Sequence, residues 1–344
     1  MKKPVILGLF LVAIGVATAL ADEGRVPIFQ VTSISQPGTY VLTRNIGAMV
    51  GSAITIQASN VTLDLNGMTV TTSDAFAPII QIGDNFEGIH IRDGRLGGGS
   101  YGIFYGTGGG VSPSTIWIEN VVISQTGFEG VYLTNLRQFE MTACKLHNLG
   151  GNGVLLVTGG GAFAGRIVGN QFTEMRGGII VGSSNNLLIQ DNVMSGLSSY
   201  GINLGSSRAS IVRGNTLIAA SGNGGGGIVT GSGGNLLIVD NFLDGFTDGV
   251  SLGGGAGSRV SGNVIRNMWL INPTAGHGIG VGGTGGALRN LIEGNQIEGN
   301  AGCGIRFDAT ASSNVYRNNM LRGNTGGAVC NAGVGNTDAG GNVL

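Results

Sequence analysis

Asparagine recurs along this chain at intervals of 22 to 32 residues, and an apolar residue follows each one two positions later. Gly94 and Cys144 fill the two places where the spacing demands another member. A repeat of this length is typical of a solenoid, in which each repeat forms one coil and packs only on its neighbours. The ten asparagines are Asn66, Asn120, Asn170, Asn192, Asn215, Asn241, Asn263, Asn295, Asn319 and Asn342.

Two further apolar columns accompany the asparagine, three residues before it and two after it. Another segment opens with glycine and then alternates, as in Gly178-Ile179-Ile180-Val181. Alternation of period two indicates strands, and no helical period is present. The sequence therefore predicts an all-β fold, a single right-handed parallel β-helix of about 12 coils with three short strands per coil.

Stacked coils bring each asparagine over the next. An amide can donate and accept along the axis, and asparagine tolerates the left-handed backbone that a bend requires. We expect an internal asparagine ladder, which consists of Asn120, Asn170, Asn192, Asn215, Asn241, Asn263, Asn295 and Asn319.

The first residues have the pattern of an export signal. Lys2 and Lys3 supply the positive start, Val5 to Val16 the apolar run, and Ala19-Leu20-Ala21 the small-residue cleavage pattern. We expect residues 1–21 to be removed and residues 22–344 to form the β-helix. The apolar run is too short for a stable transmembrane segment, so the mature protein is expected to be extracellular or periplasmic.

Charge and cysteine content narrow the possibilities further. The chain has 18 Lys and Arg against 19 Asp and Glu, without the cationic cluster of a nucleic-acid-binding protein. The repeat places Cys303 and Cys330 about four strand positions out of register, roughly 13 Å apart, which is beyond disulfide reach. We therefore expect Cys144, Cys303 and Cys330 to be buried thiols.

With these features the chain resembles the pectin-lyase-like right-handed β-helix superfamily, and in particular bacterial secreted proteins described as right-handed parallel β-helix repeat proteins. The resemblance depends on the segments Pro37 to Leu42 and Ser59 to Gly67 and on the recurring Gly-Asn and Gly-Ile pairs. It implies the fold over essentially the whole mature chain. It does not select one activity, since the superfamily includes lyases, hydrolases, epimerases, adhesins and phage tail parts.

Two motifs look like parts of polygalacturonase motifs. Gly276-His277-Gly278 matches Gly-His-Gly, and Thr247-Asp248-Gly249 matches part of Asn-Thr-Asp-Gly, with Phe246 in place of the asparagine. An inverting hydrolase needs two carboxylates, whereas Ser251 to Ala275 contains no acidic residue. Asp248 and His277 are thus catalytic candidates only if the protein is an enzyme.

A lyase of the pectate type needs carboxylates that hold Ca²⁺ and a basic residue. The best local group is Asp191, Arg213 and Asp240, and Ca²⁺ is expected only under this alternative; otherwise we expect no cofactor. Copper-handling β-helix proteins of the periplasm share the predicted fold, but His90, His147 and His277 lie on distant coils. We therefore expect no metal site.

The middle position of the Gly-Ile strand points outward and is apolar over several coils. An exposed apolar strip can bind a partner, and aromatic rings can stack on sugars; alternatively, a loop such as Gly106 to Ser114 covers it. The strip and the aromatic residues near it are Phe104, Tyr132, Leu155, Ile180, Tyr101 and Phe128.

The chain stops at Asn342-Val343-Leu344, inside an expected strand, so end-to-end association of rods is also expected. The sequence favours an exported non-catalytic β-helix that binds a polysaccharide or cell-envelope glycan, or acts as a structural element at the cell surface. The alternative is a polysaccharide-active lyase or hydrolase of the pectin-lyase-like superfamily.

Overall fold

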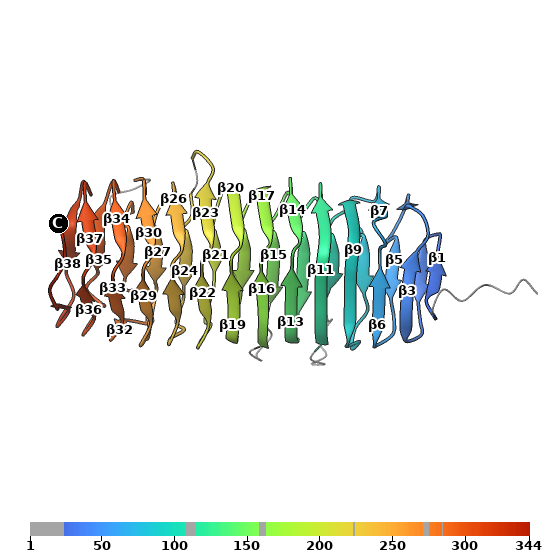
Figure 1. Cartoon of the computed structure of the whole chain (residues 1–344), viewed down its shortest axis with the longest axis horizontal. Coiled ribbons are helices and arrows are strands. Elements are labelled where there is room, and N and C mark those ends of the chain that lie inside the picture. The colour runs from blue at the N-terminus through green and yellow to red at the C-terminus, as the bar shows by residue number, and fades with distance from the viewer. Residues whose placement is uncertain (1–23, 107–113, 158–162, 223, 271–274, 284) are drawn as a thin grey trace, which may run out of the picture.

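The protein is a rod of stacked coils (Figure 1). The computed structural model describes residues 24–344 except 107–113, 158–162, 223, 271–274 and 284, so the expected signal peptide lies outside the described residues. These residues form strands, turns and irregular segments without a helix, and hence without a helix able to cross a membrane. The predicted parallel β-helix of about 12 coils is confirmed.

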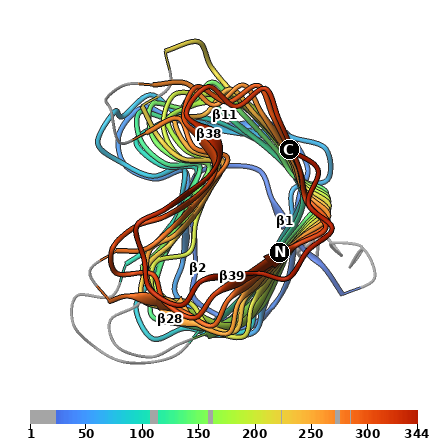
Figure 2. The same cartoon turned by 90° about the vertical axis from the view of Figure 1, so that its left-hand side faces the viewer.

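One sheet has 13 parallel strands, one from each coil. Viewed along the rod, the coils superpose, and the outline is pinched inward on the side where β38 lies (Figure 2). The strands of this sheet are β2 (Thr32–Ile34), β5 (Ile54–Ile56), β8 (Ile80–Ile82), β10 (Ile103–Tyr105), β12 (Val131–Thr134), β15 (Val154–Val157), β18 (Ile179–Val181), β21 (Ile202–Asn203), β24 (Ile228–Thr230), β27 (Val250–Leu252), β31 (Ile279–Val281), β35 (Cys303–Phe307) and β38 (Gly327–Asn331).

The other large sheet has 24 strands in two rows, which β9 and β11 join because they run through the bend between the rows. The row before the bend contains β1 (Val26–Ile28), β3 (Gly38–Leu42), β6 (Val61–Asp64), β9 (Ile89–Gly98), β11 (Ser114–Ser124), β13 (Leu136–Thr142), β16 (Phe163–Val168), β19 (Ser184–Gln190), β22 (Ile211–Arg213), β25 (Leu237–Val239), β29 (Arg259–Ser261), β33 (Leu291–Glu293), β36 (Val315–Arg317) and β39 (Thr337–Asp338).

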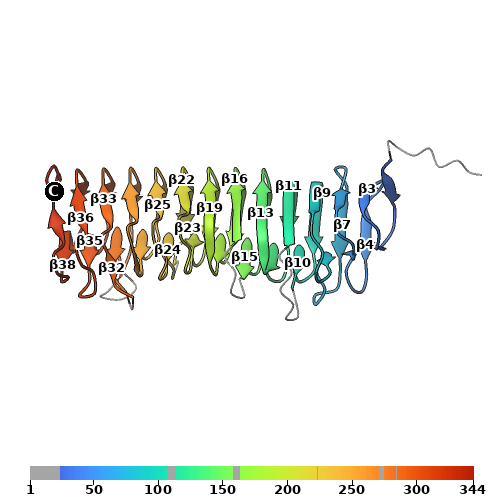
Figure 3. The ribbon, with the colours of Figure 1, turned by 90° about the horizontal axis from the view of Figure 1, so that it is seen from below.

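The row after the bend contains, besides the ends of β9 and β11, β4 (Ile46–Ala48), β7 (Thr69–Thr72), β14 (Lys145–His147), β17 (Gln171–Met175), β20 (Val193–Leu197), β23 (Thr216–Ala219), β26 (Phe242–Asp244), β30 (Val264–Arg266), β34 (Gln296–Glu298) and β37 (Met320–Arg322). A small sheet pairs β28 (Gly255–Ala256) with β32 (Ala287–Leu288). The two rows and the 13-stranded sheet supply the three strands predicted per coil, and the coils follow one another along one axis (Figure 3).

The asparagine ladder is confirmed from Asn170 onward. Asn192 is representative: its backbone N–H and its Nδ2 both donate to Asn215 Oδ1, at 3.0 and 2.9 Å. Its Nδ2 also donates to Ile167 O at 2.8 Å. The same pattern continues to Asn342, and Cys144 N–H donates to Asn170 Oδ1. The ladder thus satisfies polar backbone groups that the core would otherwise bury unpaired.

Two predicted members of the column lie outside this ladder. Asn120 is exposed, has φ 51° and donates to Asp93 Oδ1. The reason is a shift of one residue in β11, where Val121 rather than Asn120 pairs with Gly94. The same shift turns Trp117 outward, between buried Ile116 and Ile118. Asn66 is also exposed, with φ 50°.

We expected the ladder asparagines themselves to adopt the left-handed backbone of the bend, but a different residue adopts it. Along the ladder, the positive φ belongs to the residue before the asparagine, as in Asp191 (53°), Gly214 (63°) and Asp240 (55°). Two shorter amide ladders, which the sequence analysis missed, stack near the carboxyl end. They are Asn290, Asn314 and Asn336, and Asn300 with Asn324.

The cysteine prediction is right for one residue and wrong for two. Cys144 is a buried free thiol, but Cys303 and Cys330 form a disulfide, with their Cα atoms 6.0 Å apart. Our distance estimate aligned Cys303 with Gly326 along straight strands, whereas Cys303 pairs with Gly327, and Cys330 pairs with Arg306 in the outward column. Gly327, at the start of β38, instead has φ 113°, a value that side-chain-bearing residues rarely adopt, and β38 is the last described strand of its sheet.

Candidate functional site

A hollow of about 290 Å³ opens on the outer face of the 13-stranded sheet, over β27, β31 and β35. The register brings Ser251, Gly280 and Arg306 side by side on these three strands. A Cβ at Gly280 would meet only Ser251 Oγ, at 3.9 Å, so two small residues leave the space open. The hollow is lined by Asp248, Ser251, Leu252, Gly253, His277, Gly280, Val281, Gly282, Gly283, Arg306 and Asp308.

Asp248 lies at the edge of the hollow, in the turn before β27. Its Oδ1 accepts a hydrogen bond from the backbone N–H of His277 at 2.8 Å. Burial raises the pKa of Asp248 to about 6, against the opposing effects of backbone hydrogen bonds from His277 and Gly276 and of the Arg306 charge. A carboxyl group with such a pKa in a hollow is a candidate functional group.

His277 is buried between Asp248 and Arg306. Its Nδ1 accepts from the backbone N–H of Cys303 at 2.9 Å, and its Nε2 lies 2.9 Å from Arg306 Nη1. A neutral imidazole has one acceptor nitrogen, so its tautomer decides whether it accepts from the Cys303 N–H at Nδ1 or from Arg306 at Nε2. The Arg306 guanidinium is a donor in either tautomer, and it lines the hollow beside His277.

The backbone and the packing of the coil explain why glycine stands on both sides of His277. Gly276 has φ 84°, and a Cβ at Gly278 would collide with Ile297. Phe246, which stands where the polygalacturonase motif has asparagine, is fully buried in the core. The Gly-His-Gly match is therefore largely a product of the repeat, and the histidine is its distinctive member.

The other catalytic candidates lie elsewhere. Asp191, Arg213 and Asp240 belong to the 24-stranded sheet and its bend, not to the hollow. Arg213 Nε donates to Gln190 Oε1 at 2.8 Å, and Gln190 Nε2 donates to Asp191 Oδ2 at 2.6 Å. Within the described part of the chain, no three His, Cys, Asp or Glu side chains come together to hold a metal ion.

The predicted apolar strip is a continuous outward row on the 13-stranded sheet. Phe104 pairs with Tyr132, Tyr132 with Leu155, and Leu155 with Ile180. The rings of Phe104 and Tyr132 stack, with centroids 5.1 Å apart and planes 7° apart. Tyr101 lies 5.0 to 5.5 Å from the rings of Phe104, Phe128 and Tyr132. Most of the loop expected to cover the strip, residues 107–113, lies outside the described residues.

The model of one protein family matches residues 119–267 and 164–337, which together exceed half of the chain. Its description is periplasmic copper-binding protein (NosD). The chain belongs to the NosD family. This family is periplasmic by its description, which agrees with the predicted export of the protein.

The cysteines and His277 of this NosD-family protein do not fit a copper site. Copper is bound in proteins by convergent His, Met or Cys ligands. Cys303 and Cys330 are joined as a disulfide, and burial raises the pKa of the Cys144 thiol to about 12. The Nδ1 of His277 is occupied by a backbone N–H, and its Nε2 faces the Arg306 cation.

Solved structures share the fold of this NosD-family protein. The A-module of a mannuronan C-5 epimerase from Azotobacter vinelandii is 16% identical, with a TM-score of 0.62 over 89% of this chain and 90% of that one. The catalytic unit of an α-1,3-glucanase from Streptomyces thermodiastaticus is 14% identical, with a TM-score of 0.58 over 93% and 62%. An alginate lyase in complex with a trisaccharide is 8% identical, with a TM-score of 0.54 over 93% and 79%. No curated protein matches the chain.

Sequence reasoning brought Asp248 and His277 forward but missed Arg306 and Asp308. Arg306 occupies the middle position of Gly304-Ile305-Arg306-Phe307, the same outward position as Phe104 and Ile180. Reading that outward column to its end, past Ser251 and Gly280, would have identified a cation beside two small residues.

Proposed function

We propose that this NosD-family protein binds a polysaccharide along the outer face of the 13-stranded sheet without catalysing a reaction on it. The hollow at Asp248, His277 and Arg306 is the observation that supports this most directly. It combines the guanidinium donors of Arg306 with the carboxylate oxygens of Asp248 and Asp308. This is the polar complement that sugar hydroxyl groups require.

The outward row of the same sheet gives such a chain a path. From Phe104 it continues in register through Ile180 and Ser251 to Arg306. Eight strand spacings separate the first and last of these residues, about 40 Å. An extended glycan lying along the rod can therefore contact the aromatic cluster at one end and the hollow at the other.

The separation of the carboxylates favours binding over hydrolysis. Glycoside hydrolases place two carboxyl groups about 5 to 9.5 Å apart. Asp308 is in register with Gly282 and Gly253, five positions along the strand from Asp248. Five positions correspond to roughly 16 Å along the strand, and two coil spacings add to this distance. The two carboxyl groups are therefore too far apart to act on the same glycosidic bond.

A polysaccharide-active enzyme is the second candidate. One observation favours it: the pKa of Asp248 is raised to about 6, which suits a group that exchanges a proton near neutral pH. The three structural neighbours described above are, by their names, an epimerase, a glucanase and an alginate lyase. If the protein is an enzyme, we expect it to act on a polysaccharide by a reaction that needs only one carboxylate.

The test is retention of the protein on a panel of immobilised glycans, with each glycan also assayed for new reducing ends and unsaturated uronates. Gly280→Leu fills the hollow without straining the backbone and should abolish retention. Gly97→Leu is the matched control, since Gly97 has comparable space but lies in β9 of the other sheet. Retention that survives Gly280→Leu would contradict the proposed site, and turnover of any glycan would favour the enzyme.

End-to-end association of rods stays a prediction. The outermost strands of the 13-stranded sheet within the described residues are β2 and β38, and open strand edges can pair with another chain. Sedimentation velocity over a hundredfold concentration range would detect it as a mass that rises with concentration.

A further inference from the structure

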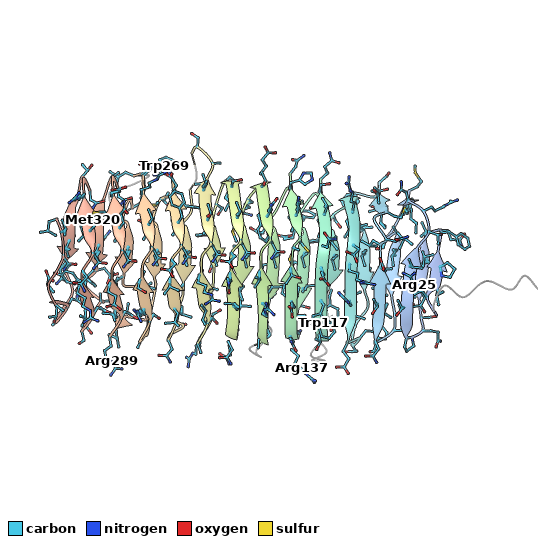
Figure 4. The ribbon with its side chains drawn as sticks, viewed as in Figure 1. Arg25, Trp117, Arg137, Trp269, Arg289 and Met320 are labelled. Carbon is cyan, nitrogen blue, oxygen red and sulfur yellow. A yellow bond between two sulfur atoms is a disulfide. The ribbon has the colours of Figure 1, made fainter. Side chains whose placement is uncertain are left out.

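A second hollow, of about 310 Å³, lies on the opposite side of the coil, over the outer face of the 24-stranded sheet. It is lined by His90, Trp117, Ile118, Glu119, Glu140 and Thr142, which come from β9, β11 and β13. Figure 4 shows Trp117 on the sheet that faces the viewer. The function proposed above uses none of these residues.

The alternation of β11 produces this hollow. Ile116 and Ile118 point into the core, so Trp117 and Glu119 point outward. The register places Trp117 between His90 and Glu140, and Glu119 beside Thr142. The hollow thus has an indole on its central strand and a carboxylate on each of two strands.

The charged side chains around the indole differ in the ion pairs that they form. Arg166 lies 3.4 Å from Glu140, and Arg92 pairs with Asp64 at 2.9 Å. Glu119 is different: its side chain is 56% exposed, and its one ion pair among the described residues is with His90, at 3.4 Å. That contact is an ion pair only while the imidazole is protonated; beside a neutral imidazole, Glu119 offers a carboxylate to a cation.

An aromatic face beside a carboxylate is the arrangement that recognises an organic cation. The indole N–H of Trp117 has no hydrogen-bond partner within the described residues and can donate to a ligand oxygen. The flat face of a sugar ring packs on an indole, and the volume suits about one ring. We propose that this hollow binds an amino sugar with a free ammonium group, as one unit of a glycan, with its ammonium on Glu119.

The test uses the fluorescence of Trp117. The chain has two tryptophans, so in a Trp269→Phe background Trp117 is the single reporter. The protein is titrated with the β-1,4-linked glucosamine tetramer and, separately, with its fully N-acetylated form, which keeps the rings but removes the charge. We expect the free amine to quench the fluorescence and to bind about tenfold more tightly, as an exposed ion pair with a cation–π contact predicts.

Glu119→Gln removes the charge at an exposed position, where the substitution should not impair folding. It should weaken binding of the free amine by about twofold to fivefold and leave the acetylated form unaffected. Glu298→Gln, outward on β34 of the same sheet, is the matched control. Equal affinities for the two tetramers, or a Glu119→Gln protein that binds like the control, would overturn the proposal. Spermidine binding as tight as that of the glucosamine tetramer would also overturn it, because the ring would then contribute nothing.

Discussion

The backbone N–H of His277 donates to Asp248 Oδ1 at 2.8 Å, across the spacing between two neighbouring coils. Despite this bond, burial raises the pKa of the carboxyl group to about 6. The turn before β27 therefore holds an acid whose ionised form the fold does not stabilise. Groups that cost stability are common at binding and catalytic sites, which is why this turn is the best candidate site on the rod.

Replacing Asp248 by asparagine should make the rod more stable at neutral pH. The pKa is higher in the folded protein than the ordinary value of 3.8, so the folded state holds the proton more tightly than the unfolded chain. The stability that this group contributes is present below about pH 4 and is lost as the pH rises to about 6. A shift of roughly two units corresponds to about 1 to 3 kcal/mol.

The measurement is urea unfolding of both proteins at pH 4 and pH 7. The advantage of Asp248→Asn should be small at pH 4 and close to its full size at pH 7. An advantage of equal size at both values would mean that the change acts through packing rather than through the proton.

Breaking the asparagine ladder should be more costly than changing a half-buried asparagine outside the ladder. Asn215→Leu removes the acceptor of the Asn192 backbone N–H and the Asn215 amide donor to the Ile189 carbonyl, while Asn192 Nδ2 keeps only its bond to Ile167 O. Two buried polar groups that lose this partner, at about 1 to 3 kcal/mol each, predict a loss of roughly 2 to 6 kcal/mol. Asn203→Leu, in the outward row between Ile180 and Val229, is the control: it removes one part-buried hydrogen bond, from the Gly205 N–H, and should cost about 1 kcal/mol. Similar losses for both would show that the ladder has no special role.

Much of the fold was predictable because the repeat states the same pattern many times. The places where the prediction failed are those where one coil departs from its neighbours. Asn120 fits the spacing, but β11 is shifted by one residue, so the hydrophobic side chains of Ile116 and Ile118 decide which face is buried. The disulfide was missed for a related reason: a register taken from interior coils does not apply to the terminal strand.

The site was predictable only in part. Asp248 and His277 stood out because their residue types are rare in the repeat, and the structure brings them together. Asp191 and Arg213 also stood out, yet their positions belong to the other sheet. Arg306 completes the hollow from the next coil, and a search for local motifs cannot find a residue that is adjacent only through stacking.

The aromatic cluster can stabilise the rod, bind a glycan, or do both, and a pair of variants separates these roles. Phe104→Ser with Tyr132→Ser removes the stacked pair, which is worth about 0.5 to 1.5 kcal/mol beyond its buried area. If the cluster contacts a glycan, this variant should also lose retention on the glycan panel. Leu155→Ser, in the same outward row, is the control, since it removes apolar surface without removing a ring. Equal retention of both variants would limit the cluster to a structural role.

Reducing the disulfide should loosen the carboxyl-terminal coils before the rest of the rod. Cys303 and Cys330 are separated by 27 residues, and loop closure of this size is worth about 3 to 4 kcal/mol. Coils contact only their neighbours, so hydrogen exchange after treatment with dithiothreitol should accelerate in β35 and β38 while the ladder around Asn215 stays protected.

Cys303→Ser with Cys330→Ser should behave like the reduced protein. Cys144→Ser is the control, because a hydroxyl there can still reach the carbonyl oxygens of Ile118 and Thr142 that Cys144 Sγ contacts now. Uniform acceleration along the rod would instead show that its coils unfold as one unit.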